Sequence, residues 1–412
     1  MKNNGIDNGL SNGLTNPSTF VGSANGLQNS EQQISDVNTF IFTVRTTGTK
    51  AIVLPLVSTG TYAFWIDWGD GNKEFVRAFS LIYSGETTVR THTYPLGLKD
   101  YTIKITGICR GWSYVGVASE QPKLRSIQQF GCLELIDDFV NNAQQFANCV
   151  NLDLSNVKDT LSTKFLTSTT GIFGSCTIIN KINLINNWNV GNITSFNTMF
   201  ANSDFNSEIS GWNMSNATNL NSMFQSCDNF NQYIGNWDTS NVTNMGNMFP
   251  NCIFFNQDIS SWNTANATAM NNMFQGTSSF NQPIGSWDVS KVINMGNMFS
   301  SASAFNQPIG SWNVSVVTNM SSMFQNATDF NQDIGAWGIG AVTSFTGFMA
   351  SKTPATFSTA NLDAIYSGWS SRPSQLNLSI SFGTANYTTA GGSAGRAILV
   401  SRGWTIVDGG GI

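Results

Sequence analysis

The amino-acid sequence predicts a repeat solenoid of short parallel strands and short helical turns, with an N-terminal all-β sandwich and a small C-terminal cap. Two periodic signals predict the solenoid. Tryptophans recur in one step of 24 residues and then five of 25, at Trp188, Trp212, Trp237, Trp262, Trp287, Trp312 and Trp337. Met-Phe pairs keep the same period from Met199-Phe200 to Met323-Phe324. Because one such unit cannot bury its own apolar side chains, neighbouring units must share a continuous core.

One unit, residues 280–304, shows the expected local structure. Trp287 and Val289 alternate with polar neighbours, as in a half-buried strand, and Ser290 offers a hydroxyl that suits a helix start. Apolar residues then follow at the spacing of one helix face, at Val292, Met295, Met298 and Phe299. We therefore expect two core columns, formed by Trp212, Trp237, Trp262, Trp287 and Trp312 and by Phe224, Phe249, Phe274, Phe299 and Phe324.

A column of small residues lies three positions after the phenylalanine of each repeat. It contains Cys149, Cys176, Cys227 and Cys252, and other repeats carry Ser, Thr or Ala there. We interpret these cysteines as small buried side chains, although stacking would also allow Cys227 and Cys252 to form a disulfide. A metal site is not expected, because no histidine accompanies them and no Cys-x-x-Cys occurs.

The segments predict five regions in chain order: residues 1–36 as a Gly/Asn-rich docking arm, 37–112 as the sandwich, 113–190 as irregular first rungs, 191–350 as the regular repeats and 351–412 as the cap. The arm cannot bury enough apolar surface to fold alone. We expect it to be ordered by contact with another chain. Its candidate anchors are its sizeable apolar side chains, Leu10, Leu14, Phe20, Val21 and Leu27.

Two short motifs in the β region carry a resemblance. Trp65-Ile66-Asp67-Trp68-Gly69-Asp70-Gly71 and Thr91-His92-Thr93-Tyr94 resemble the hallmarks of polycystic-kidney-disease-type (PKD) sandwiches, which implies a spacer or a ligand-contacting domain. Asp67 and Asp70 are weak candidates for a calcium site. We favour the alternative, in which Asp70-Gly71 forms a hairpin turn, Asp67 binds the loop backbone and His92 packs between strands.

The repeat itself carries a second resemblance. The unit FNQPIGSWDVSKVINMGNMFSSASA resembles the leucine-rich-repeat-like units of BspA-like bacterial surface proteins, known from mycoplasma surface lipoproteins, over residues 182–349. This resemblance implies an LRR-like solenoid with a parallel sheet and a role in adhesion or surface display. The tail, residues 403–410, is more weakly similar to the closing segment of repeat proteins from phages and bacterial surfaces.

Composition excludes several classes of function. Only 10% of residues are charged and the formal net charge is −5, so neither nucleic acid nor an anionic membrane is an expected partner. No apolar stretch is long enough to insert into a membrane, and no secretory leader or lipidation cysteine is visible at the N-terminus. Residues 391–395 match the G-x-S-x-G elbow, but only Asp408 follows as an acid and no histidine does. We therefore expect no catalysis and no cofactor.

The sequence leaves two functions open. The first, which we favour from sequence, is a virion component, such as a phage head or tail protein, that docks through its arm onto other virion proteins in a homo- or hetero-oligomer. The second is a bacterial BspA-like cell-surface adhesin that binds a host protein or a glycan. Rows of Asn suit sugars, but they also suit turns within the stack, and we favour the latter role.

Overall fold

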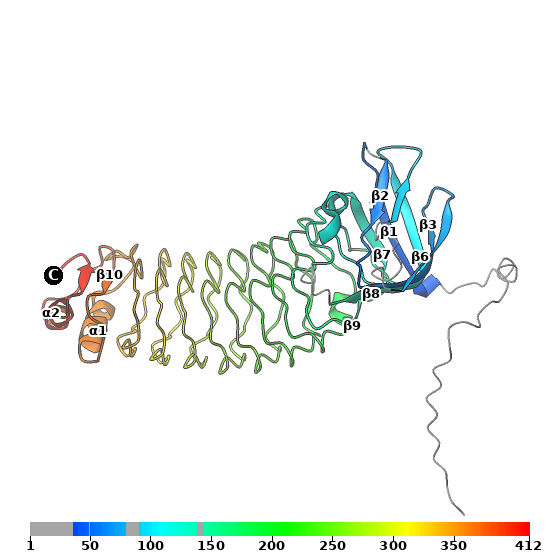
Figure 1. Ribbon diagram of the computed structural model, residues 1–412. Coiled ribbons are helices and arrows are strands. Elements are labelled where there is room, and N and C mark those ends of the chain that lie inside the picture. Colours follow the sequence, from blue (N-terminus) through cyan, green and yellow to red (C-terminus); the bar gives the residue numbers. More distant parts are fainter. Residues whose placement is uncertain (1–35, 49, 80–89, 138–143) are drawn as a thin grey trace, which may run out of the picture. The chain divides into compact units, whose positions relative to one another are not determined.

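The computed structural model describes residues 36–48, 50–79, 90–137 and 144–412. The predicted arm anchors, from Leu10 to Leu27, lie outside the described residues. The N-terminal β region contains one main sheet with the strand order β4-β3-β6-β1-β7 (Figure 1). Each pair of adjacent strands in this order is antiparallel. These strands are β1 (Thr39–Arg45), β3 (Thr61–Asp67), β4 (Lys73–Phe79), β6 (Asp100–Arg110) and β7 (Leu124–Gln129).

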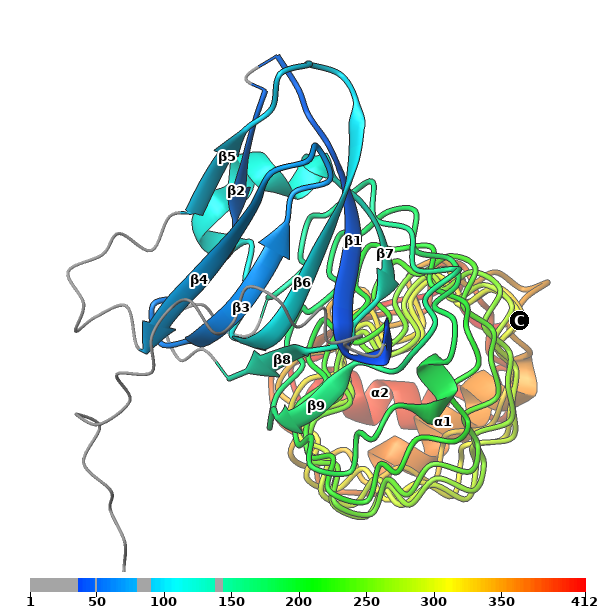
Figure 2. The ribbon, with the colours of Figure 1, turned by 90° about the vertical axis from the view of Figure 1, so that its right-hand side faces the viewer.

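Shorter strands complete this region. β2 (Ala51–Leu54) and β5 (Arg90–Thr93) form a separate antiparallel pair. β8 (Leu133–Ile136) pairs in parallel with the end of β6, and β9 (Ser162–Phe165) pairs in parallel with β8. These two strands connect the β region to the repeats, since β9 already lies among the first rungs (Figure 2).

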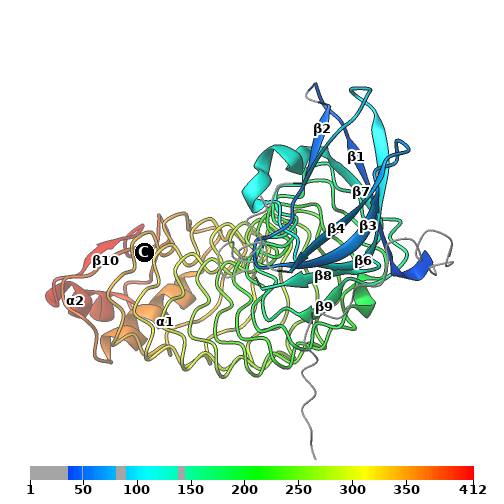
Figure 3. The ribbon, with the colours of Figure 1, turned by 45° about the vertical axis from the view of Figure 1, so that its right-hand side comes forward.

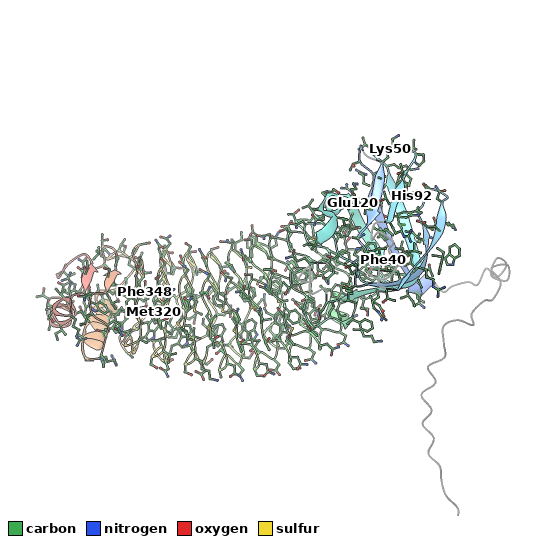
Figure 4. The ribbon with its side chains drawn as sticks, in the orientation of Figure 1. Phe40, Lys50, His92, Glu120, Met320 and Phe348 are labelled. Carbon is green, nitrogen blue, oxygen red and sulfur yellow. The ribbon has the colours of Figure 1, made fainter. Side chains whose placement is uncertain are left out.

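Alternation of apolar and polar residues places one face of the main sheet in a core. Phe40, Phe42 and Val44 of β1 are buried there, and Trp112 contacts both phenylalanine rings edge-on, at centroid distances of 5.1 and 5.5 Å. A 3₁₀ segment, Val115–Lys123, covers β2 on one side. Glu120 of this segment is labelled in Figure 4. It accepts the N–H of Val53 at 3.0 Å and forms a buried ion pair with Lys123 at 2.6 Å.

We call residues 144–350 the repeat stack. Successive 25-residue turns of chain follow one another along it, and a view along the stack superposes them closely (Figures 1 and 2). Residues 191–350, all of which the structure describes, contain no helix and no strand. Each rung forms a single isolated parallel bridge with the next, as in Asn219 to Asn244 and Asn294 to Asn319.

The predicted LRR-like solenoid of short parallel strands and short helical turns is therefore wrong. The regular sheet of this protein is mainly antiparallel and lies in the N-terminal β region, and the repeats are built from turns. The segment around Trp287 and Val289 is not a strand, because the N–H of Trp287 turns back onto the carbonyl of Ile284 at 3.1 Å.

Two backbone positions in each repeat explain why no helical turn forms. Asn297 and Ser301 have φ values of 55° and 59°, in the left-handed region that interrupts a right-handed helix. Equivalent positions in neighbouring repeats carry Asn, Ser or Gly with the same sign of φ, at Asn247, Asn251, Asn272, Gly276, Ser322 and Asn326. Met295 and Met298 therefore do not share a helix face. Ser290, the expected cap, donates its N–H to Asp288 Oδ1 at 2.9 Å in a local turn.

This alternating backbone joins one repeat to the next. From Leu220 to Ser226, every second residue donates its N–H to a carbonyl oxygen of the following repeat: Leu220 to Asn244, Ser222 to Gly246, Phe224 to Met248 and Ser226 to Pro250, at 2.8–3.1 Å. The backbone groups of the turns are thus satisfied without a regular strand, as burial requires.

The C-terminal residues cover the last rung (Figure 3). They form α1 (Thr359–Ser370), β10 (Ser379–Ser381), α2 (Ser393–Ser401) and β11 (Thr405–Val407). β10 bridges the stack through Phe345 and Ile380 and pairs in parallel with β11.

Candidate functional site

The tryptophans of the repeats form a buried column along the stack. The five tryptophans of the predicted Trp column have relative exposures of 3–4%. Rings of Trp212, Trp237, Trp262 and Trp287 stack at 6.3–6.4 Å within 5° of parallel. Each indole Nε1 of the column donates to an isoleucine carbonyl of the preceding repeat, as Trp287 does to Ile259 at 3.2 Å.

The phenylalanine column runs beside the tryptophans. Its five members are fully buried, and successive rings from Phe224 to Phe324 lie 5.7–5.8 Å apart and nearly parallel. The methionines preceding them are buried too. Figure 4 labels Met320 in the stack and Phe348 at its end.

The column of small residues lies inside the stack. All six cysteines of the chain lie in the described part, and all are unpaired. The thiols of Cys227 and Cys252 point back to the carbonyl oxygens of Phe200 and Phe224, at 3.0 and 2.9 Å, and Thr277 uses its hydroxyl in the same way. Burial raises the pKa of the Cys227 thiol to about 12. These groups are hydrogen-bonded structural side chains.

The asparagine of each Phe-Asn-Gln unit also serves the stack. Asn256 Oδ1 accepts the backbone N–H of Asn281 at 3.0 Å and the amide of Gln282 at 2.9 Å. The same arrangement recurs in the neighbouring repeats. The side-chain oxygens of this Asn row are therefore engaged in repeat-to-repeat contacts.

Two further columns face outward. Threonine hydroxyls donate to the carbonyl of the corresponding residue one repeat back at 3.1–3.2 Å, in Thr218, Thr243, Thr268, Thr318 and Thr343. Exposed amides of Asn216, Asn241 and Asn266 donate to carbonyl oxygens of the preceding repeat, those of Gly191, Ser215 and Ser240, at 2.7–2.8 Å. The exposed polar groups are therefore held in place by the stack, which reduces the entropy that binding must remove.

A polar groove crosses the first rungs. It has a volume of about 320 Å³ and is lined by Gln, Asn, Ser and Thr side chains, with no charged residue. Ala147, Gly174 and Ala201 also line it, and the repeat that follows contributes Gln225 at the corresponding position. Such a neutral, hydrogen-bonding channel suits a sugar chain or an extended peptide.

The predicted loop residues of the β region are occupied by protein contacts. Asp67 accepts the N–H of Gly69 at 2.9 Å and pairs with Lys73 at 3.1 Å. Asp70 accepts the N–H of Asn72 and lies 2.7 Å from His92 Nε2, which stacks on Trp68. Burial alone would raise the pKa of Asp70, but the hydrogen bonds from His92 and Asn72 hold it below its usual range. Among the described residues, no three His, Cys, Asp or Glu side chains gather as metal ligands.

The G-x-S-x-G match marks the start of α2. A side chain at Gly395 would lie 2.3 Å from the carbonyl oxygen of Tyr366, so this glycine lets α2 approach α1 closely. Asp408 accepts from Arg396 at 2.7 Å, from the N–H of Gly410 at 3.2 Å and from the hydroxyl of Tyr366. In the described part of the chain, no helix is both long enough and apolar enough to span a membrane.

Sequence reasoning missed the residues that end the stack. Lys352 continues the column of small residues, 25 positions after Ala327, and its ammonium group is buried against three carbonyl oxygens, those of Ala327, Thr328 and Phe330. A lysine at a position otherwise held by small residues was the available signal. The groove was missed because Ala and Gly at one column look unremarkable in a sequence.

The stacked repeats share an aromatic core and hold columns of polar side chains in fixed positions. This arrangement defines a repeat protein with an ordered, polar outer surface. The chain belongs to the family described as Mycoplasma protein of unknown function, DUF285, whose model matches residues 139–260 and 254–361 and so covers more than half of the chain. This membership is consistent with a BspA-like repeat protein of the bacterial surface. It favours the cell-surface alternative over the virion, for which it gives no support. No curated protein and no solved structure matches the chain. The similarities to PKD modules and to phage proteins stay predictions.

Proposed function

We propose that this protein is a non-enzymatic bacterial cell-surface protein that binds a host protein or glycan through its repeat stack. The carrying observation is the set of exposed Thr and Asn side chains that the preceding repeat holds by hydrogen bonds. Such a surface is rigid and neutral, so it suits ligands recognised by hydrogen bonds. Family membership supports the location at a bacterial surface.

The groove over the first rungs is the part of the stack best shaped to hold a ligand. Its polar side chains, such as Asn148, Ser175 and Asn202, converge on one channel. Ala201→Gln is expected to fill this groove with little effect on folding, because Gln225 and Gln275 already stand at the corresponding position of later repeats.

Binding of the full chain to a glycan array and to host cells tests the proposal. We expect binding that Ala201→Gln abolishes and that Ser300→Gln, the same change outside the groove, leaves intact. Equal binding by both variants would contradict the groove as the site. Binding by neither the native chain nor the variants would contradict the function.

Location is tested separately. Antibody labelling of intact cells, with mass spectrometry of cell envelopes and of purified phage particles, should find the protein in the envelope. Deleting residues 1–36 should leave the melting of the stack unchanged. If the protein is instead recovered in phage particles, and the deletion removes it from those particles, the virion function would be established.

A further inference from the structure

Trp65 differs from every other tryptophan of the chain. All twelve lie in described segments, and eleven have relative exposures of 4% or less, whereas that of Trp65 is 58%. An exposed tryptophan on a rigid strand gains nothing from the core of its own protein. Tryptophan is the residue type most enriched at binding sites, because its ring offers a large flat surface at low entropic cost.

Other apolar side chains extend the surface around Trp65. Phe75 of β4 stands directly opposite Trp65 of β3, with ring centroids 5.3 Å apart, and is 49% exposed. Ile108 of β6, opposite Ala63, is 47% exposed. The strands β4, β3 and β6 lie side by side at one edge of the main sheet (Figure 2). We call Trp65, Phe75 and Ile108 the aromatic face.

Cationic side chains border the aromatic face. Lys73 and Arg77 flank Phe75 on β4, and Lys104 stands opposite Asp67 on β6. All three cations are exposed. Asp67 forms an ion pair with Lys73 at 3.1 Å, and Glu74 lies between Lys73 and Phe75 on β4. Residues 37–125 contain ten Lys and Arg against six Asp and Glu, in a chain whose net charge is −5. Basic character is thus concentrated in the β region.

We propose that the aromatic face binds an acidic polysaccharide. The apolar side of a sugar ring can stack on the indole of Trp65, and its carboxylate or sulfate groups can pair with Lys104 and with Lys73. A flat sheet face has no amphipathic helix or protruding loop with which to enter a lipid interface. This site is independent of the repeat groove, which carries no charge and suits neutral ligands.

Binding of the full chain to heparin, hyaluronate and neutral dextran tests this proposal. We expect binding to at least one acidic polymer, weaker at high salt, and none to dextran. Trp65→Ala should weaken that binding about tenfold or more, and Lys104→Gln should weaken it and reduce its salt dependence. Leu98→Ala, which removes another exposed apolar side chain of the β region, is the matched control.

Each other outcome overturns the proposal. Absence of binding to every acidic polymer, or binding that Trp65→Ala leaves unchanged, excludes this face as the site. Binding to phosphatidylglycerol vesicles alone would assign it to membranes. A concentration-dependent dimer lost in Trp65→Ala would assign it to a second copy. Ala201→Gln changes the groove and not the aromatic face, so it should leave binding of acidic polysaccharide intact. Trp65→Ala should weaken that binding, and the two proposals can therefore fail independently.

Discussion

The indole Nε1 of Trp369 donates a hydrogen bond to the carbonyl oxygen of Ile334 at 3.1 Å. Trp369 lies on α1 and outside the 25-residue period, yet it makes the bond that the repeat tryptophans from Trp212 to Trp337 make to the isoleucine one repeat back. Ser358 and Asn361 likewise contact Asn331 where the next Phe-Asn-Gln unit would. The cap thus replaces the polar contacts of a missing repeat, as the last rung of a stack requires.

Trp369→Phe tests this replacement. The change leaves the Ile334 carbonyl buried without its donor, so we expect a loss of about 1–3 kcal/mol in the free energy of unfolding. Urea denaturation measures it, with Trp65→Phe as a control expected to cost less than about 0.5 kcal/mol because that ring is exposed. Equal effects of the two changes would show that the cap bond contributes little.

Phe274→Ala tests the core column. Phe274 is fully buried between Phe249 and Phe299, so its removal leaves a cavity that should cost about 3–5 kcal/mol. The same denaturation experiment applies. Ile293→Ala, an exposed position in the next repeat, should be nearly silent. A cost below about 1 kcal/mol for Phe274→Ala would mean that this column is not the core.

Asn297 tests the left-handed positions that replace the expected helical turn. Its φ is 55°, a conformation that Asn adopts more readily than Ala does. Asn297→Ala should cost about 1 kcal/mol, whereas Asn297→Gly should be within about 0.5 kcal/mol of the native chain. A more stable alanine variant would indicate a right-handed turn there. Thermal melting of the two variants side by side distinguishes these outcomes.

Lys352 gives the stability a pH dependence. Burial lowers the pKa of Lys352 to about 8, with Asp329 acting in the opposite direction, while the unfolded chain keeps a value of about 10.4. Between these values the folded state has released a proton that the unfolded state retains. The free energy of unfolding therefore rises as the pH increases from 8 to 10, and it falls again as the pH is lowered. The free energy of unfolding of the native chain minus that of Lys352→Met should follow this rise. A flat difference across this range would contradict it.

Sequence periodicity was sufficient to find the repeats, their core columns and the small-residue column, because packing of identical units demands the same side chain at the same place. It was insufficient for the backbone of those units. The spacing of Val292, Met295 and Met298 fits a helix face equally well as a chain of turns, and the choice lies with Asn297 and Ser301. Asn and Ser tolerate left-handed φ, but they do not require it.

By itself, the sequence determined that this protein is a stack of 25-residue units with a Trp, Met and Phe interior, since only mutual burial accounts for that period. Tertiary structure alone decided what the surface offers. Exposure of Trp65 depends on the register of β3 between β4 and β6, and the groove depends on Ala147, Gly174 and Ala201 being brought into line by the stack. Distant residues become neighbours only when the chain folds, so no local spacing could reveal either surface.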